Sequence, residues 1–110
     1  MVATGEGHSD EEIRLMAGQF KAMAHPVRLK ILLRLADGEC CVCDLVELSG
    51  IGFSAVSRHL SVMKSAGLVS DEKRGQKVFY RLLIPCVTSF TSCLGSVSRG
   101  EDYSMTVCCQ

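Results

Sequence analysis

Three of the seven cysteines in this 110-residue chain lie within four positions, at Cys40, Cys41 and Cys43. Thiolates are the ligands that soft metal ions and metalloids prefer. Clustered cysteines in a chain without secretory features indicate metal binding or redox chemistry rather than structural disulfides. The spacing therefore predicts that these three thiols form a site for a soft ion.

The backbone that carries these thiols has to be irregular if all three are to meet at one ion. In a regular helix, Cys40 and Cys43 would share a face while Cys41 would point about 100° away, because a turn takes 3.6 residues. The cluster leads into a short helix predicted over about residues 41–49. We expect ion binding to distort the start of that helix, and its free N-terminus to lower the pKa of the thiols.

The remaining cysteines have other roles open to them. Cys108 and Cys109 form a second pair near the end of the chain, which can supply a third thiolate or bind an ion alone. Cys86 and Cys93 lie in an apolar stretch and are expected to be small core residues. His25 and His59 are expected to be a helix cap and a packed or groove-facing side chain rather than ligands.

The elements around the cysteines follow from hydrophobic period and from stop signals. Ser9 and Glu12 predict a capping box at the start of a first helix, and Pro26 suits the first turn of a second. The period then changes from helical to alternating between residues 68 and 83, which predicts a hairpin with a turn at residues 74–76. The expected helices span about residues 9–23, 26–35, 41–49, 53–67 and 85–98.

This order predicts an α+β, mainly α fold: a winged helix-turn-helix of five helices with a two-stranded β-hairpin wing. The expected domain covers residues 9–98, between flexible tails at 1–8 and 99–110. A domain of this size has a modest core, so dimerisation would stabilise it.

Charge supports a surface for a polyanion, although the net charge is zero. Residues 51–82 contain six bases and two acids, whereas residues 1–50 contain five bases and eight acids. The exposed face predicted for helix 53–67 has hydroxyls and cations and no carboxylate, as a helix in the major groove requires. The candidate DNA-binding residues are Ser54, Ser57, Arg58, Ser61 and Lys64 on this helix and Lys73, Arg74, Gln76 and Lys77 on the hairpin.

Composition excludes several other classes. With 47% hydrophobic and 22% charged residues, the chain is predicted to be an ordinary globular domain. It has no run of 18 apolar residues and no signal-peptide pattern, so we expect a cytoplasmic protein without membrane contact. A thiol enzyme would need a C-x-x-C pair or a phosphate-cradling loop, and neither is present. A metal-storage protein would not need the basic helix and hairpin.

Four separated motifs resemble the ArsR/SmtB family of metal-sensing repressors: "MAHPVRLKILLRLADGE", "CVCDL", "SRHLSVMKSAGLV" and "GQKVFYRL". The resemblance covers about residues 12–84. It implies a homodimer joined through the first and last helices, which binds an inverted-repeat operator in double-stranded DNA. It also implies release when arsenic(III) or antimony(III) binds cysteine thiolates.

The resemblance is closest to the arsenic/antimony-responsive branch, in which Cys41 and Cys43 match the paired thiolates of the "CVC" motif. The third cysteine of that branch is replaced here by Val46, and Cys40 stands where a leucine is usual. Cys40 is therefore the first candidate for the third ligand. The cadmium/lead branch takes further thiols from an N-terminal arm, and none precedes Cys40. A thiol redox sensor of the same fold remains an alternative.

The chemistry of the cluster agrees with this branch. Soft trivalent arsenic and antimony prefer thiolates. Their lone pair makes three ligands in a pyramid sufficient, whereas structural zinc takes four in a tetrahedron. The carboxylate and histidine ligands that other family members use for zinc on the last helix are absent, because residues 85–100 contain no His, Asp or Glu.

Overall fold

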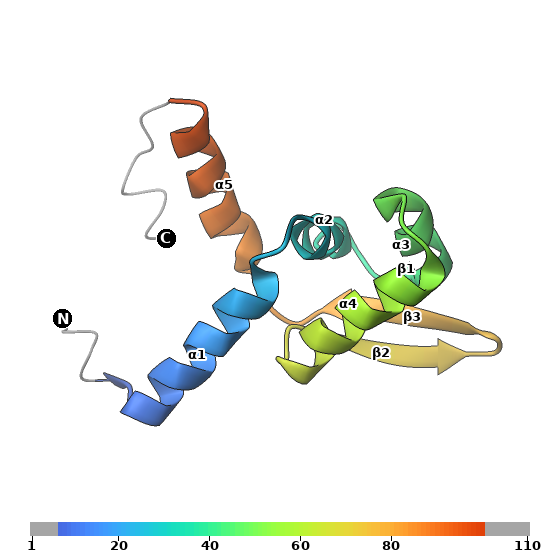
Figure 1. The fold of residues 1–110 in the computed structure, drawn as a ribbon, viewed down its shortest axis with the longest axis horizontal. Coiled ribbons are helices and arrows are strands. Elements are labelled where there is room, and N and C mark those ends of the chain that lie inside the picture. The colour runs from blue at the N-terminus through green and yellow to red at the C-terminus, as the bar shows by residue number, and fades with distance from the viewer. Residues whose placement is uncertain (1–6, 101–110) are drawn as a thin grey trace.

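The structure is a computed structural model, and it describes residues 7–100. Most of both expected tails, with Cys108 and Cys109, lies outside the described residues. The described part of the chain contains five helices and three strands (Figure 1), which confirms the winged helix-turn-helix. The elements are α1 (Asp10–Met23), α2 (Pro26–Leu35), β1 (Cys40–Cys41), α3 (Val42–Ser49), α4 (Phe53–Ser65), β2 (Val69–Arg74), β3 (Lys77–Leu82) and α5 (Val87–Ser98).

Local sequence signals place the first two helices as expected. The Ser9 side chain accepts a hydrogen bond from the Glu12 backbone N–H, and the Glu12 carboxylate accepts one from the Ser9 backbone N–H. This reciprocal pair is a complete capping box. At α2, the His25 Nδ1 atom accepts from the Val27 N–H at 3.1 Å, directly before Pro26 at the first helical position. The prediction that His25 is a helix cap is confirmed.

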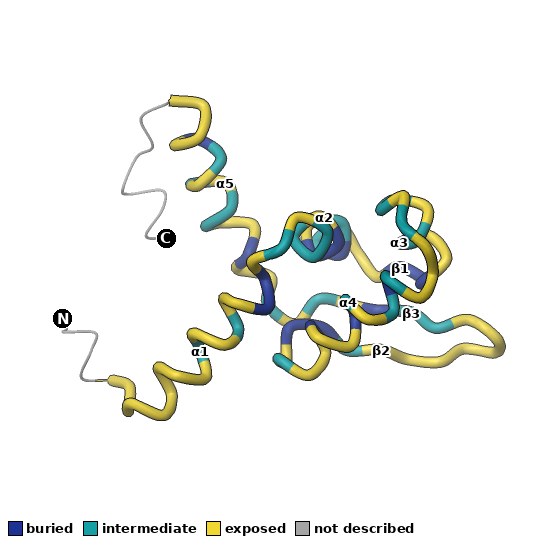
Figure 2. Tube along the Cα trace, in the orientation of Figure 1, coloured by how far each residue is buried: buried dark blue, intermediate teal, exposed yellow. Residues whose placement is uncertain are grey.

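The core lies where α2 crosses α3, α4 and the sheet. Ile31 and Leu32 of α2 are fully buried, as expected for a helix that is apolar nearly all round. Leu45 of α3 and Leu60 of α4 pack into the same cluster. Figure 2 shows buried residues gathered on α2, α4, β1 and the inner end of the hairpin, whereas the outer hairpin, α1 and α5 are largely exposed. The core therefore belongs to the helix-turn-helix and its wing.

The sheet has one strand more than the expected two-stranded hairpin. Its order is β1-β3-β2, all antiparallel, with Cys40 opposite Tyr80 and Cys41 opposite Phe79. The prediction of a two-stranded sheet was therefore incomplete, because the cysteine segment pairs with the edge of β3 before α3 begins. A two-residue strand is too short to show an alternating pattern in the sequence.

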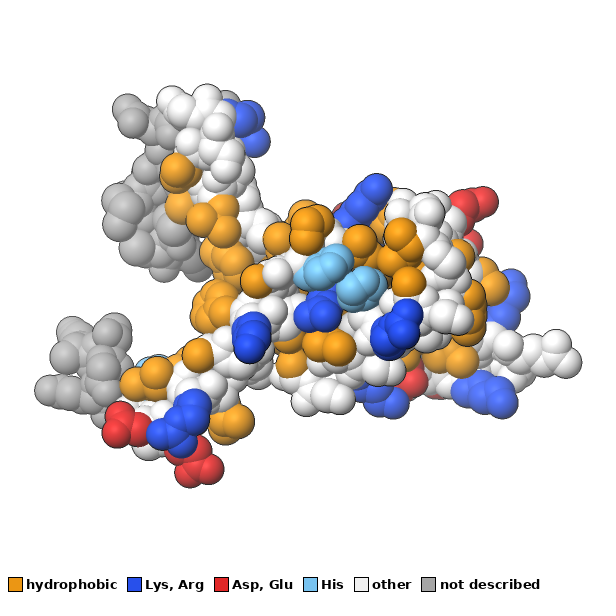
Figure 3. Space-filling model, in the orientation of Figure 1, with side chains coloured by type: hydrophobic (Ala, Val, Ile, Leu, Met, Phe, Trp, Pro, Cys, Tyr) orange, Lys and Arg blue, Asp and Glu red, His pale blue; other side chains and the backbone are white. Residues whose placement is uncertain are grey.

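Helices α1 and α5 diverge from the body of the domain (Figure 1), and apolar side chains on both helices are exposed. Phe20 of α1 and Leu94 of α5 are each 58% exposed, and Val97 is 65% exposed. A groove of about 380 Å³ lies between α1, α2 and α5, and the Phe20 and Phe90 rings meet beside it at 5.9 Å. Hydrophobic side chains gather along these two helices in Figure 3. No helix within residues 7–100 is long and apolar enough to cross a membrane.

Candidate functional site

Helix α4 presents the expected polar face. Val56, Leu60 and Met63 are buried against the core, which turns the hydroxyls and Arg58 outward. Ser54, Arg58, Ser61 and Lys64 are exposed and Ser57 is half-buried. Helix α3 packs against α4, so the two form the helix-turn-helix pair. The candidate residues on α4 therefore share one face.

The hairpin places its candidate cations at the far end of the wing. Gly75 and Gln76 form the turn between β2 and β3, and Gly75 adopts a φ of 64°, which glycine tolerates without strain. Lys73, Gln76 and Lys77 are exposed. The wing is therefore a basic projection beside α4.

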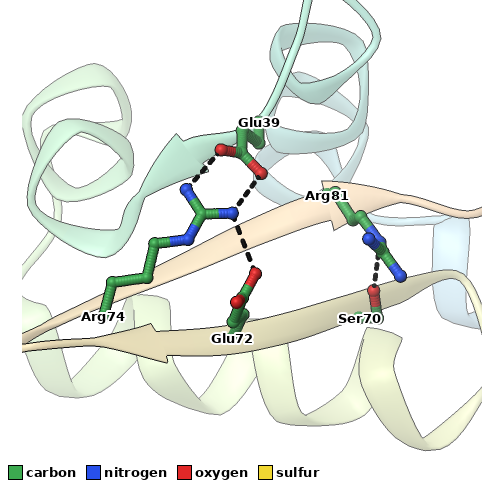
Figure 4. Close-up of polar contacts among 5 residues, drawn as sticks. All are labelled: Glu39, Ser70, Glu72, Arg74 and Arg81. Carbon is green, nitrogen blue, oxygen red and sulfur yellow. Dashed lines mark hydrogen bonds and ion pairs between the residues drawn. The ribbon is translucent and has the colours of Figure 1, made fainter.

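Arg74 differs from the other wing cations because two carboxylates hold it (Figure 4). Its Nη1 and Nη2 atoms donate to the two oxygens of Glu39, the second at 3.0 Å, and Nη2 also donates to Glu72 at 2.8 Å. The guanidinium lies 4.7 Å from the centre of the Phe79 ring. The hydrogen bond from Arg74 holds the pKa of the Glu39 carboxyl below its usual range. In this structure Arg74 contacts protein groups on three sides.

Lys64 is also paired. Its Nζ lies 2.9 Å from Asp71 on β2, and this hydrogen bond raises the pKa of Lys64. The contact joins the C-terminal half of α4 to the wing. It lies on the surface, so its contribution to stability is small and its main effect is on geometry.

The cysteine cluster is divided by the local backbone. Cys40 and Cys41 are consecutive strand residues, so their side chains point to opposite sides. Cys40 is 3% exposed and belongs to the hydrophobic core, Cys41 is 7% exposed at the residue directly before α3, and Cys43 is exposed in the first turn of α3. The three side chains therefore start from three different environments.

The prediction that the helix N-terminus lowers the pKa of the thiols is wrong for Cys40. Burial raises the pKa of the Cys40 thiol, and the positive charge of Arg34 only partly opposes this. The physical reason is that Cys40 precedes α3 and packs inward, away from the free N–H groups that would favour a thiolate.

The three thiols are ligands of the type that trivalent arsenic or antimony prefers, but their side chains are not arranged to bind one ion together. Within residues 7–100, no three His, Cys, Asp or Glu side chains are placed to hold a metal ion together. Ion binding by Cys40, Cys41 and Cys43 would require the β1 segment to rearrange. Cys108 and Cys109 lie outside the described residues.

His59 lies on α4 behind the polar face, and it is packed rather than free. Its Nδ1 accepts a hydrogen bond from Arg28 Nε at 3.1 Å, and its ring lies 4.4 Å from the His25 ring. Burial, followed by the nearby His25, Arg28 and Arg58, lowers the pKa of His59. Of the two expectations for His59, a groove-facing or a packed side chain, these contacts favour the packed one.

Two residues of this surface were missed by sequence reasoning. Glu39 forms an ion pair with Arg74, and Asp71 forms one with Lys64. Both of these cations were predicted to contact DNA. Glu39 lies 35 residues from its partner, so no short-range spacing rule could find the contact. The one available signal was that acidic residues stand beside the basic ones on the hairpin at Asp71 and Glu72.

Comparison with known proteins agrees with this geometry. Residues 25–71 match the model of the bacterial regulatory protein arsR family. The chain is 37% identical to the transcriptional repressor SdpR of Bacillus subtilis over 88 residues, which cover 79% of this chain and 98% of SdpR. It is 44% identical to the arsenical resistance operon repressor of Escherichia coli over 64 residues, covering 57% of this chain and 55% of that repressor.

Another relative belongs to a different branch. The HTH-type transcriptional repressor SmtB of Mycobacterium tuberculosis is 42% identical over 72 residues, which cover 64% of this chain and 53% of SmtB. The match to these two repressors thus spans only about half the length of each.

Solved structures give the same fold. The winged helix-turn-helix domain Mb0332 from Mycobacterium bovis, described as homodimeric and DNA-binding, superposes with a TM-score of 0.75 at 26% identity, over 89% of this chain and 97% of that one. NolR from Sinorhizobium fredii superposes with a TM-score of 0.70 at 31% identity, over 93% of this chain and 98% of NolR. The helix-turn-helix, the wing and these relatives together show that the chain belongs to the arsR family of bacterial regulatory proteins.

Proposed function

We propose that this protein is a homodimeric, metal(loid)-responsive transcriptional repressor that leaves its operator when arsenite or antimonite binds cysteine thiolates. The observation that carries the proposal is the position of the cysteine segment. Cys41 and Cys43 lie at the N-terminus of α3, and α3 packs directly against the DNA-facing helix α4. An ion that changes the start of α3 can therefore change the presentation of α4.

DNA binding is supported by shape and charge. An α-helix fits the major groove, and its exposed side chains then meet base edges and phosphates. On α4, Ser57 and Arg58 are the central candidates, while Lys73 and Lys77 of the wing extend toward the flanking backbone. Relatives of this chain include proteins named as repressors, and the solved Mb0332 domain is described as DNA-binding.

The dimer follows from α1 and α5. Both helices expose large apolar side chains, including Phe20, Leu94 and Val97, and contiguous surfaces of this kind mark protein–protein contacts. A twofold partner that presents the same surface would cover them, as closed homodimers do. The Mb0332 domain, which superposes over most of this chain, is described as homodimeric.

The identity of the inducer rests on the thiols and on relatives named for arsenical resistance. Soft trivalent metalloids need only three thiolates, which this segment contains. A cadmium/lead sensor or a thiol redox sensor would use the same segment, and SmtB-type relatives are also present. The inducer therefore has to be tested among these candidates.

The test is a pair of titrations on the reduced protein with DNA from directly upstream of its gene. The expected result is specific binding that Arg58→Gln weakens by about 5- to 150-fold, the loss of roughly 1–3 kcal/mol typical of a base contact. Lys30→Gln, which removes the same charge from an exposed position on α2, should bind nearly normally. Titration with arsenite, antimonite, cadmium and peroxide then identifies which agent releases the DNA. Absence of specific binding, or release only by cadmium or peroxide, would contradict the proposal.

A further inference from the structure

The segment that carries the cysteines is tied to the wing by one side chain. Glu39 directly precedes β1, and its carboxylate accepts two hydrogen bonds from Arg74 at the end of β2. Figure 4 shows Arg74 reaching from the wing between Glu39 and Glu72. Two parallel bonds fix direction as well as distance, which a single lysine contact would not do.

A second contact, within the wing, holds Arg74 beside the strand that pairs with β1. The Arg74 guanidinium lies 4.7 Å from the centre of the Phe79 ring, and Phe79 is the residue of β3 that pairs with Cys41. Arg74 is therefore stacked beside the strand pair that holds the cysteines. These contacts are half-exposed, so they add little to global stability and chiefly set position.

Gathering the thiols would have to disturb this arrangement. Cys40 and Cys41 point to opposite sides of β1, so a site that includes both requires the backbone to leave the register with Tyr80 and Phe79. A strand of two residues has few hydrogen bonds to lose. Because Glu39 directly precedes β1, its carboxylate cannot keep both hydrogen bonds to Arg74 when that backbone moves.

We propose that the Glu39–Arg74 contact is a latch that couples the cysteine segment to the wing, so that metalloid binding frees Arg74 and displaces the wing in addition to altering α4. This inference rests on the proposed function for its ligand. It assigns to Glu39 the role of a positioning residue, which acts on DNA binding through Arg74. The latch itself exists without ligand and can be tested without it.

The first experiment therefore uses no metalloid and measures alkylation of Cys40 by N-ethylmaleimide in the reduced protein, resolved by mass spectrometry. Glu39→Gln and Arg74→Gln should each raise the Cys40 rate by about twofold or more, because buried Cys40 reacts only when β1 opens. Direct charge effects on the thiol would move the two variants in opposite directions, so a shared increase identifies the latch.

Glu72→Gln is the matched control, since it removes a partner of Arg74 that lies on β2 and not beside the cysteines. It should leave the Cys40 rate near that of the wild type. The double variant Glu39→Gln/Arg74→Gln should react no faster than the faster single variant, because both remove one contact. Opposite shifts in the two single variants, or unchanged rates, would overturn the latch.

The second experiment follows the amide of Gly75 at the wing tip by ¹⁵N-resolved NMR during titration with arsenite. Gly75 should shift in the wild type and in Glu72→Gln but not in Glu39→Gln, while the amides of residues 40–43 shift in all three. An equal Gly75 shift in Glu39→Gln would overturn transmission through the latch. If the amides of residues 40–43 do not shift in any of the three proteins, both the proposed function and the transmission from the cysteines to the wing are wrong. The alkylation result alone then decides whether the latch exists.

Discussion

The Nε atom of Arg28 donates a hydrogen bond to Nδ1 of His59 at 3.1 Å, which joins α2 to α4, the helix that we propose faces DNA. Because Nδ1 accepts this bond, the neutral ring has its proton on Nε2. Protonation of His59 would place a second positive charge beside Arg28 and remove the acceptor. The contact is therefore compatible with neutral histidine only.

This contact makes stability depend on pH near neutrality. Burial, with the adjacent His25 and Arg28, lowers the pKa of His59 from its usual 6.5. The unfolded chain therefore takes up a proton first as the pH falls, and the stabilisation present above about pH 6.5 is lost as the pH falls through the folded pKa. The thermal midpoint should decrease from about pH 7.5 to 5.5, and less steeply in His59→Gln. His8→Gln, which alters an exposed histidine, should keep the wild-type slope.

His25 gives a second stability prediction. Its Nδ1 caps α2 through the Val27 N–H. His25→Ala should lower the free energy of unfolding by roughly 0.5–2 kcal/mol, the usual loss for a side-chain cap, as measured by urea denaturation. His25→Asn, which can accept the same bond, should recover most of it. Equal losses in both variants would show that stacking on His59, not capping, is what His25 contributes.

The wing cations should differ in their effect on DNA binding. Lys73 and Lys77 are exposed, so Lys73→Gln or Lys77→Gln should weaken binding to all sequences and reduce the slope of log K against log salt by about 1. Arg74→Gln should reduce that slope less, because Glu39 and Glu72 already neutralise Arg74. A salt series for the three variants measures this, and equal slopes would mean that DNA displaces both carboxylates.

The dimer prediction concerns α5. Leu94→Asp should convert the dimer to a folded monomer, because Leu94 is exposed in the single chain and its loss costs the monomer little packing. Light scattering gives the mass and circular dichroism checks the fold. Leu83→Asp, an equivalent change at an exposed position outside α1 and α5, should remain dimeric. A monomer from both variants would indicate general destabilisation.

Much of the fold could be predicted because its signals are local. The capping box at Ser9, Pro26 at the start of α2 and the basic hairpin each act over a few residues, and each was found where expected. Strand β1 could not be predicted, because its two residues pair with β3 across about 40 positions and have no period of their own. The sequence thus determined the elements better than their long-range pairing.

The candidate site divides in the same way. The exposed face of α4 follows from burial of Val56, Leu60 and Met63 at helical spacing. The burial of Cys40 and the neutralisation of Arg74 depend on tertiary contacts with Tyr80 and Glu39, which spacing does not encode. These contacts are what make the cysteine segment and the wing one connected surface.

We propose that the thiols at the start of α3 control DNA binding. The most direct test is fluorescence anisotropy of the reduced protein on its upstream DNA, titrated with arsenite. Cys41→Ser/Cys43→Ser and, as the matched control, Cys108→Ser/Cys109→Ser are titrated in parallel. The wild type and the control should release the DNA, while Cys41→Ser/Cys43→Ser should stay bound. Release of Cys41→Ser/Cys43→Ser at the wild-type arsenite concentration would contradict this proposal.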